Sequence, residues 1–200
     1  MPKKPKLMVA TRNRHKTGEI RAMLGDRYEV SDANDAEGLP HVEETGETFL
    51  ENATLKAVEI SRHIDGIVLS DDSGLEVDAL GGAPGVWSAR FGGVEGDHAR
   101  NNRRLLQELE NVPPERRGAR FRCVMVLARN GETLADFDGA VEGHIIGDLR
   151  GDGGFGYDPL FVPEGHNATF AELGDSVKNR LSHRARALAK AAAWLEQEGH

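Results

Sequence analysis

Two adjacent carboxylates, Asp71 and Asp72, are the strongest candidates for chemistry in this sequence. They follow residues 67–70, an apolar segment that predicts a short buried strand. Charges at the carboxyl end of a buried strand are costly to place, and ligands bind at that edge of open α/β sheets. The alternative is a plain turn, which Asp-Ser-Gly favours. Carboxylates completed by waters and substrate phosphates are typical ligands of Mg²⁺.

A second candidate motif surrounds a predicted helix. Thr48 and Glu51 match a capping box, which marks a helix start. Asn52 and Lys56 are four residues apart and would share one face of that helix. Glu44 lies just before the helix, where its carboxylate could hold a divalent cation. The alternative is that the acidic residues only favour the positive end of the helix.

The segment between the first predicted strand and the first predicted helix could bind an anion. A strand-to-helix turn offers backbone N–H groups and the positive end of the helix dipole. A hydroxyl, an amide and a lysine at this turn suit phosphate oxygens, although an ordinary helix cap with a surface lysine would look the same. The candidate residues are Thr11, Arg12, Asn13, Arg14, His15 and Lys16.

A glycine-rich segment at residues 151–159 contains the pattern G-x-G-x-x-G. In dinucleotide-binding folds this pattern follows a strand and opens a helix. Here Asp158-Pro159 would break a helix, so we reject that interpretation. We expect a flexible loop that presents Phe155 and Tyr157, on whose rings a flat base could stack.

Near the start of the last predicted helix, Lys178, His183 and Arg184 could donate hydrogen bonds to a ligand. The alternative is a basic face that balances the acidic residues elsewhere. The remaining histidines are scattered without ligand spacing, so we do not expect zinc. The single cysteine, Cys123, lies within a predicted strand, where we expect it to pack.

The motifs are distributed over strands mixed with helices. Asn13 opens a helix that ends at Gly25, and the apolar face beginning at Phe49 predicts a helix ending at Gly66. Asn130-Gly131 predicts a hairpin between strands at 121–129 and 132–137, with a further strand at 141–146. Ser182 caps the last helix. This order favours an α/β or α+β fold around one long sheet.

Composition sets the broad class. The 200 residues suffice for one domain, and the net charge of −8 disfavours non-specific binding to nucleic acid. The longest apolar run, residues 123–128, is far shorter than the ~20 residues of a membrane span. The N-terminus lacks the apolar stretch of a secretory signal. We therefore expect a cytoplasmic protein that binds neither nucleic acid nor membranes.

The ordered set of motifs is more specific than any one of them. Thr11-x-Asn-x-x-Lys16, Glu44-Thr-Gly-x-Thr-Phe-x-Glu-Asn-Ala-x-x-Lys56 and the run from Asp71-Asp-Ser-Gly to Ser-Ala-Arg90 come first. Gly153-Gly-Phe-Gly-Tyr-Asp-Pro159, Thr169-Phe-Ala-Glu-Leu173 and Lys178-Asn-x-x-Ser-His-Arg184 follow. From about Lys6 to Leu188, the chain resembles the inosine triphosphate pyrophosphatase family, enzymes that hydrolyse deaminated purine nucleoside triphosphates.

The resemblance implies an α/β fold with a long central mixed sheet, flanking helices, and two lobes with a cleft between them. It also implies that residues 1–200 form a single nucleoside triphosphate pyrophosphatase domain, and that the protein is a homodimer. The implied reaction converts a purine nucleoside triphosphate and water into the nucleoside monophosphate and diphosphate. The implied cofactor is Mg²⁺.

The resemblance also assigns roles to residues. Asp72 would be the base for the attacking water, and Glu44 and Asp72 would hold the metal. The implied substrate-binding residues are Thr11, Arg12, Asn13, Arg14, His15, Lys16, Lys56, Ser73, Phe155, Gly156, Tyr157, Asp158, Lys178, His183 and Arg184.

The sequence leaves two alternatives open. The chain could be a nucleotide-binding regulator without catalysis, although binding alone would not need Glu44, Lys56 and Asp72 together. It could instead be a Maf-type pyrophosphatase acting on other modified nucleotides, whose motifs differ from Ser182-His183-Arg184. Diphosphate release from a panel of nucleotides separates these possibilities.

Overall fold

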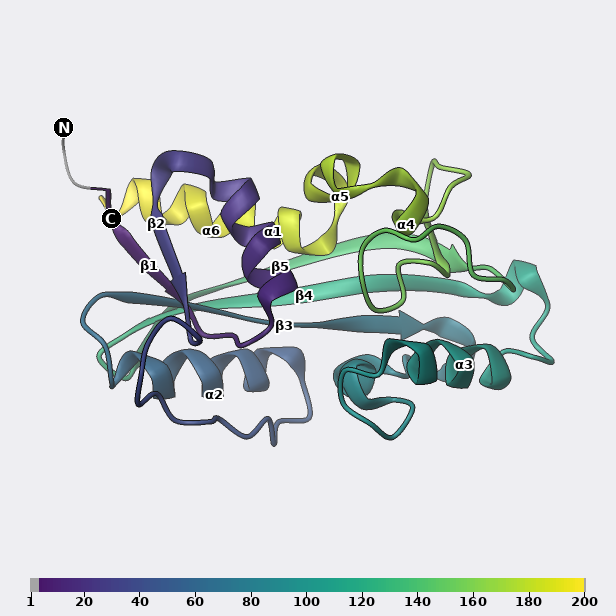
Figure 1. Ribbon diagram of the computed structural model, residues 1–200, viewed down its shortest axis with the longest axis horizontal. Helices are drawn as coiled ribbons and strands as arrows, with labels where there is room; N and C mark the ends of the chain where they lie inside the picture. Colours follow the sequence, from purple (N-terminus) through teal and green to yellow (C-terminus); the bar gives the residue numbers. More distant parts are fainter. Residues whose placement is uncertain (1–3, 200) are drawn as a thin grey trace. The chain divides into compact units, whose positions relative to one another are not determined.

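The structure is a computed structural model that describes residues 4–199. Figure 1 shows its helices and strands along the chain. The strands are β1 (Lys6–Val9), β2 (Glu29–Asp32), β3 (Ile67–Val77), β4 (Gly118–Arg129), β5 (Glu132–Ile145) and β6 (Phe161–Pro163). The α-helices are α1 (Arg14–Leu24), α2 (Phe49–Ser61), α3 (His98–Glu108), α4 (Phe170–Leu173), α5 (Asp175–Leu181) and α6 (His183–Gln197). Short 3₁₀ turns lie at Gly25–Arg27, Asp78–Leu80, Gly85–Arg90 and Pro114–Arg116.

Within residues 4–199 the strands form a six-stranded sheet in the order β2-β1-β3-β4-β5-β6. Strand β1 pairs in parallel with both β2 and β3, whereas β6 pairs antiparallel with β5. The sheet is therefore mixed and has flanking helices, which confirms the predicted α/β class. None of the helices in the described part of the chain is long and apolar enough to cross a membrane.

The chain divides into two compact units. The first comprises the residues up to Asp72, Cys123–Gly139 and the residues from Arg184 onward. The second comprises Ser73–Arg122 and Ala140–His183. The chain thus passes from one unit to the other four times, after Asp72, Arg122, Gly139 and His183.

In the first unit, alternate strand residues face two different helix layers. Leu7, Val9, Ile67 and Leu69 pack into a core with residues of α1 and α6, whereas Val68 packs with Ile60 of α2. Figure 1 accordingly shows α1 and α6 on one side of these strands and α2 on the other. Because successive strand side chains point to opposite faces, the sheet is buried on both.

The second unit has its own core. Leu75 and Val77 at the end of β3 pack with Leu105 of α3 and with Phe121 and Phe161. The Phe121 and Phe161 rings meet edge to face, with their centroids 4.7 Å apart. This core supports the loop that follows β5, the segment in which the glycine-rich motif lies.

Local signals predicted most of the elements at these positions. Asn13 caps α1, Gly25 ends it, and Thr48 and Glu51 form the capping box of α2. Asn130 and Gly131 have φ of 53° and 82°, the left-handed pair that a two-residue hairpin requires.

Three predicted boundaries are wrong. Helix α2 ends at Ser61, so Ile64 lies beyond it, in the turn that leads to Gly66. Strand β3 continues to Val77 instead of ending at residue 70, because contacts across the sheet outweigh a local turn preference. Residues 132–137 and 141–145 belong to one strand, β5. The short strands β2 and β6 and the helix α3 had no clear sequence signal.

Gly143 tests the tight packing of β5 against β6. A Cβ at Gly143 would run into the carbonyl oxygen of Val162 and lie 2.6 Å from the Phe161 ring. We expect Gly143→Ala to lower the free energy of unfolding by about 2 kcal/mol, the usual cost of overpacking. At Gly147 a Cβ would be 3.7 Å from the Arg117 guanidinium, an ordinary contact, so Gly147→Ala is the control. Equal urea midpoints for both variants would contradict the close approach.

Candidate active site

The two adjacent aspartates lie inside strand β3, and they face opposite sides of the sheet. Asp71 contacts Lys16 of α1 and Arg184 of α6, whereas Asp72 faces Lys56 of α2. The neighbouring Ser70 has the same orientation as Asp72, because its hydroxyl donates to the carbonyl of Ala53 in α2. The prediction that both carboxylates sit at the end of a strand is therefore wrong. Alternation along an extended strand separates them.

Asp71 is fully buried and surrounded by cations. Its Oδ2 lies 3.0 Å from Lys16 Nζ and 3.3 Å from Arg184 Nη2. Arg184 is itself buried and makes a second ion pair with Glu19 of α1. Burial alone would raise the pKa of Asp71, but Lys16, Arg184 and Lys56 outweigh it and hold that pKa well below its usual range. Asp71 therefore stays ionised and joins α1 to α6.

Asp72 has a different electrostatic environment. Its Oδ1 lies 3.9 Å from Lys56 Nζ, and that ammonium also donates to Glu44 at 2.5 Å and to the Asp71 carbonyl at 2.8 Å. Burial raises the pKa of Asp72, and repulsion from Glu44 adds to it, while Lys56, Lys16 and a hydrogen bond with Asn52 oppose it. The result is a carboxylate with raised proton affinity, as a general base requires.

Lys56 remains protonated although it is buried. Burial lowers its pKa, but the charges of Asp72, Glu44 and Asp71 outweigh that effect and raise it. The α2 capping box sets the start of the helix and thereby the positions of Asn52 and Lys56 on its sheet-facing side. Asn52 also accepts a hydrogen bond from the backbone N–H of Gly46 at 2.8 Å, which holds the chain that leads away from Glu44.

The residues between β1 and α1 form the turn that the sequence predicts. Asn13 accepts hydrogen bonds from the backbone N–H groups of His15 and Lys16, and Thr11 accepts one from Asn13. Arg14 and His15 are exposed. Arg12 instead donates to the carbonyls of Ala33 and Leu39, so its guanidinium holds the loop after β2.

Glu44 and Asp72 fit a site for a hard divalent cation. Both carboxylates lie within 4 Å of the same Lys56 nitrogen, and both offer oxygen ligands. Among residues 4–199, no group of three or more His, Cys, Asp or Glu side chains could hold a metal ion. Two carboxylates, completed by waters and substrate phosphates, are what Mg²⁺ takes in phosphoryl-transfer sites.

The glycine-rich segment forms a second cluster, in the second unit. Asp158 is buried, accepts from the Phe155 backbone N–H at 2.8 Å, and pairs with Lys178 at 2.6 Å. The same Lys178 nitrogen lies 4.3 Å from the centre of the Phe155 ring. Tyr157 is buried, and its hydroxyl donates to the Ser88 carbonyl at 2.9 Å. The loop is thus held by side-chain anchors and presents a half-buried aromatic ring beside an ammonium group.

The three basic residues near the last helix have separate surroundings. Lys178 is in the Phe155 cluster, and the His183 ring stacks on Phe121 at 5.0 Å. Arg184 belongs to the first unit and pairs with Asp71 and Glu19. We expected these residues to form one set of donors, but the structure gives each a different partner. Ser73 lies in β3, directly after Asp72.

Sequence reasoning overlooked three residues that contact this machinery. Glu19 pairs with Arg184, and its spacing of three from Lys16 on α1 was the available signal. On α3, His98 lies near the Phe155 ring and Asn102 donates to the Gly156 carbonyl. The arginines of this helix lie on its exposed side, whereas its buried face carries two asparagines, Asn101 and Asn102.

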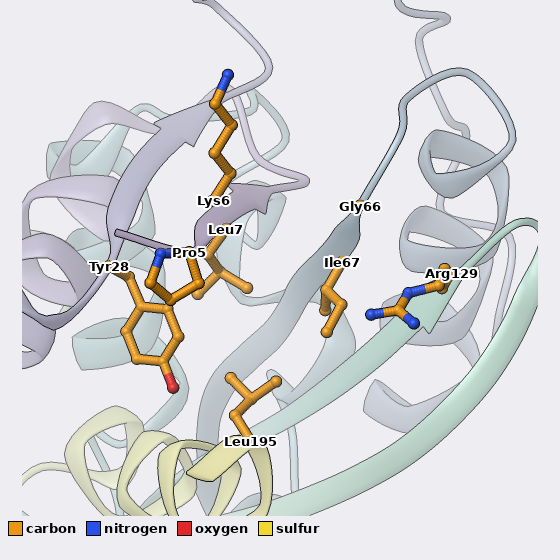
Figure 2. Close-up of a pocket in the computed structure, with 8 residues that line it drawn as sticks. All are labelled: Pro5, Lys6, Leu7, Tyr28, Gly66, Ile67, Arg129 and Leu195. Atoms are coloured by element: carbon orange, nitrogen blue, oxygen red, sulfur yellow. The ribbon is translucent and has the colours of Figure 1, made fainter. Parts of the chain in front are cut away.

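A cavity of about 190 Å³ in the first unit lies elsewhere (Figure 2). It is lined by Pro5, Lys6, Leu7, Tyr28, Gly66, Ile67, Arg129 and Leu195. None of these is a predicted site residue. Lys6 and Ile67 begin β1 and β3, so the cavity is at the amino ends of these parallel strands, whereas ligands of such sheets bind at the carboxyl ends.

The fold and the ordered motifs define a member of a known family of α/β proteins. The chain belongs to the Ham1 family, whose profile matches residues 7–194. It is 47% identical over 192 residues to a dITP/XTP pyrophosphatase of Bacillus licheniformis, covering 96% of this chain and 98% of that protein. It is 52% identical to a dITP/XTP pyrophosphatase of Exiguobacterium sibiricum, covering 95% and 96%. These matches confirm the family resemblance found in the sequence.

Solved structures agree with the fold. A HAM1 protein from Coxiella burnetii matches with a TM-score of 0.86 and 36% identity, over 96% of this chain and 99% of that one. A nucleoside-triphosphatase, dITP/XTP pyrophosphatase, from Mycobacterium abscessus matches with a TM-score of 0.75 and 43% identity, over 93% and 98%.

The opposite environments of Asp71 and Asp72 predict opposite effects on stability. Because the folded pKa of Asp71 lies below its unfolded value, its ionisation stabilises the fold above that value, and the stabilisation is lost as the pH falls. Because the folded pKa of Asp72 lies above its unfolded value, its ionisation destabilises the fold as the pH rises through this range.

At pH 7 we therefore expect Asp71→Asn to lower the free energy of unfolding by about 3 kcal/mol, the low end for breaking a buried ion pair. Asp72→Asn should leave it unchanged or raise it. Urea unfolding of the two isosteric variants measures this contrast. Equal losses for both would contradict the electrostatic assignment.

Proposed function

We propose that this protein hydrolyses deaminated purine nucleoside triphosphates, such as dITP, ITP and XTP, to the nucleoside monophosphate and diphosphate. The observation that carries the proposal is Asp72, a buried carboxylate of raised pKa, beside Glu44 and the protonated Lys56. The names of relatives that align over nearly the whole chain agree with this chemistry. We propose that residues 1–200 act as one pyrophosphatase domain, in the cytoplasm, where it would clear such nucleotides from the pool.

The phosphate groups would bind to the first unit. In this proposal the turn of residues 11–16 supplies backbone N–H groups at the start of α1, and Lys16 and Lys56 supply positive charge. Arg14 and His15 are exposed beside them and can reach a ligand from solvent. Lys16 already sits against Asp71, so its ammonium is held in place before the phosphates arrive. Pre-positioned charge of this kind is the main source of catalysis in phosphoryl transfer.

Asp72 would orient and deprotonate the attacking water. Its neighbour Asp71 is unsuited to this role, because its cations hold its pKa low and occupy it. The positive charge of Lys56 opposes the rise in the pKa of Asp72, and the same charge would face the phosphates. The link between the α- and β-phosphates breaks and releases diphosphate, and the oxygen of water stays on the phosphate of the nucleoside monophosphate.

Glu44 and Asp72 would hold the metal, and we propose Mg²⁺. When bound, the ion would neutralise charge on the phosphate oxygens. Lys56 lies between the two carboxylates and reduces their repulsion. Displacement of this ammonium toward the phosphates would leave both carboxylates available to the cation.

The base would bind to the second unit. We propose that it stacks on Phe155, with Gly156, Tyr157 and Asp158 shaping the loop. Ser73 follows Asp72 in β3 and would lie near the attacking water. Lys178 and His183 would contact the edge of the base. Arg184 stays in the proposed substrate set, since a guanidinium carries several N–H donors, but its pairing with Asp71 and Glu19 makes it chiefly a support for Asp71.

The donors of this cluster explain a preference for deaminated bases. Inosine and xanthosine present an acceptor oxygen at position 6, whereas adenosine presents an amino group. The Lys178 ammonium can only donate, so an adenine amino group would face it without a hydrogen bond. A site of this kind rejects the wrong partner by up to roughly 10⁴-fold. Stacking on Phe155 adds affinity without discrimination, because every purine has a flat face.

A panel of nucleotides tests the function. Wild-type protein with Mg²⁺ should release diphosphate from ITP, dITP and XTP with a far higher kcat/KM than from ATP. Asp72→Asn preserves shape but removes the base, so turnover should fall about 10²-fold or more while binding changes less. Binding of ITP without diphosphate release by the wild type would identify a regulator. Release only from modified pyrimidine or methylated nucleotides would identify a Maf-type enzyme.

The metal assignment has a matched pair of variants. Glu44→Gln keeps size but loses a charged oxygen ligand, so the Mg²⁺ concentration for half-maximal activity should rise about tenfold or more. Glu43 is its exposed neighbour, and Glu43→Gln should leave the Mg²⁺ dependence unchanged. Activity that persists in EDTA, or equal Mg²⁺ curves for both variants, would overturn the assignment.

We also propose that the protein is a homodimer. The 3₁₀ turn at Gly85–Arg90 exposes 56% of Trp87, and the following loop exposes 44% of Val94. Arg90 covers one face of the Trp87 ring at 4.5 Å. An interface that covers these side chains would remove their apolar surface from water. Sedimentation equilibrium at micromolar concentration should give the mass of a dimer, and a monomer would refute the proposal.

A further inference from the structure

One face of helix α3 supports the Phe155 loop. His98 and Asn102 are one helical turn apart, so they project from the same side of α3. The His98 ring centroid lies 6.2 Å from that of Phe155, and Asn102 Nδ2 donates to the Gly156 carbonyl at 3.0 Å. Two consecutive residues of the loop are therefore contacted from α3.

The amide of Asn102 has its orientation set by this contact. A carbonyl can only accept, so the NH₂ group must face Gly156. The other end of the amide, Oδ1, is buried and has no hydrogen-bond partner among residues 4–199. A buried acceptor without a partner is destabilising. An apolar residue of the same size would avoid this loss, so the bond to Gly156 is the feature that an asparagine adds here.

The peptide whose carbonyl Asn102 holds belongs to Gly156, a residue with unusual backbone freedom. Gly156 has φ of +65°, and a Cβ there would meet nothing within 4 Å, so its backbone freedom is what the loop uses. Asp158 anchors the peptide N–H of Phe155 before it, and Ser88 anchors the side chain of Tyr157 after it. The Gly156 carbonyl between them is fixed by Asn102.

We infer that Asn102 is a positioning residue that determines base specificity. Its hydrogen bond selects one orientation of the peptide between Gly156 and Tyr157. That orientation in turn sets the angle of the Phe155 ring relative to the Lys178 ammonium, which lies 4.3 Å from the ring centre. Without the Asn102–Gly156 hydrogen bond, the Phe155 ring still stacks on any purine. The Lys178 ammonium, however, no longer meets position 6 of the purine in a fixed geometry. The inference rests on the proposed function, in which this loop binds the base.

The adjacent residue supplies a matched control. Asn101 is also buried on α3, and its Nδ2 donates to the Ala89 carbonyl at 3.1 Å, outside the Phe155 loop. Asn101→Asp and Asn102→Asp each replace one amide donor by a carboxylate that faces a backbone carbonyl. Both variants should lose stability, and Asn101→Asp should lose less, because Asn101 Oδ1 also accepts from the Gly92 N–H at 2.6 Å, a bond that a carboxylate keeps. A third variant, Asn102→Leu, removes the donor and also the unpartnered acceptor, so it should fold at least as well as Asn102→Asp.

The readout is the ratio of kcat/KM for ITP to that for ATP, measured by diphosphate release. We expect Asn102→Leu and Asn102→Asp to lower this ratio about tenfold, mainly through a loss with ITP, and Asn101→Asp to leave it within about twofold of wild type. If Asn102→Asp does not fold, the ratio is measured with Asn102→Leu alone.

Two results would overturn the inference while leaving the function intact. Both presuppose that the wild type prefers ITP. In the first, the ratio of kcat/KM for ITP to that for ATP is unchanged in the Asn102 variants. In the second, Asn101→Asp changes this ratio as much as the Asn102 variants do. A wild-type protein that releases no diphosphate from ITP would instead overturn the proposed function, and this inference with it.

Discussion

The alternation of side chains along strand β3 is the constraint on which the site depends. Two adjacent aspartates in one extended strand must face opposite sides of the sheet, and both sides are covered by helices. Each buried charge therefore needs a cation from the layer that it faces. Lys16 and Arg184 serve Asp71, and Lys56 serves Asp72. The helix layers and the candidate chemistry are thereby tied to the same two residues.

The two carboxylates divide structural and chemical work between them. The cations around Asp71 outweigh the effect of its burial and keep its pKa low. Its ion pairs with Lys16 and Arg184 hold two helices against the strand. Asp72 shares a single lysine with Glu44, and its burial leaves its ionised form disfavoured. Functional sites often retain such unfavourable electrostatics, because a group that is fully stabilised has little reactivity left.

Much of this arrangement could be predicted from short stretches of sequence. The cap at Asn13, the capping box at Thr48 and the hairpin at Asn130 depend on neighbouring residues, and the structure has them where the sequence predicts. The prediction for residues 71–74 was wrong for the opposite reason. Their turn preference is local, but pairing within the sheet and ion pairs from three helices keep them extended.

The family, the class of fold and the residue types available for chemistry follow from the amino-acid sequence alone, because composition, spacing and ordered motifs carry them. Which group each side chain meets depends on how the chain folds. Arg184 pairs with Asp71, 113 positions away, although its sequence neighbours predicted a role at the base. Asn102 reaches Gly156 across 54 positions. Contacts between such distant residues depend on how strands and helices pack, and no local pattern records that packing.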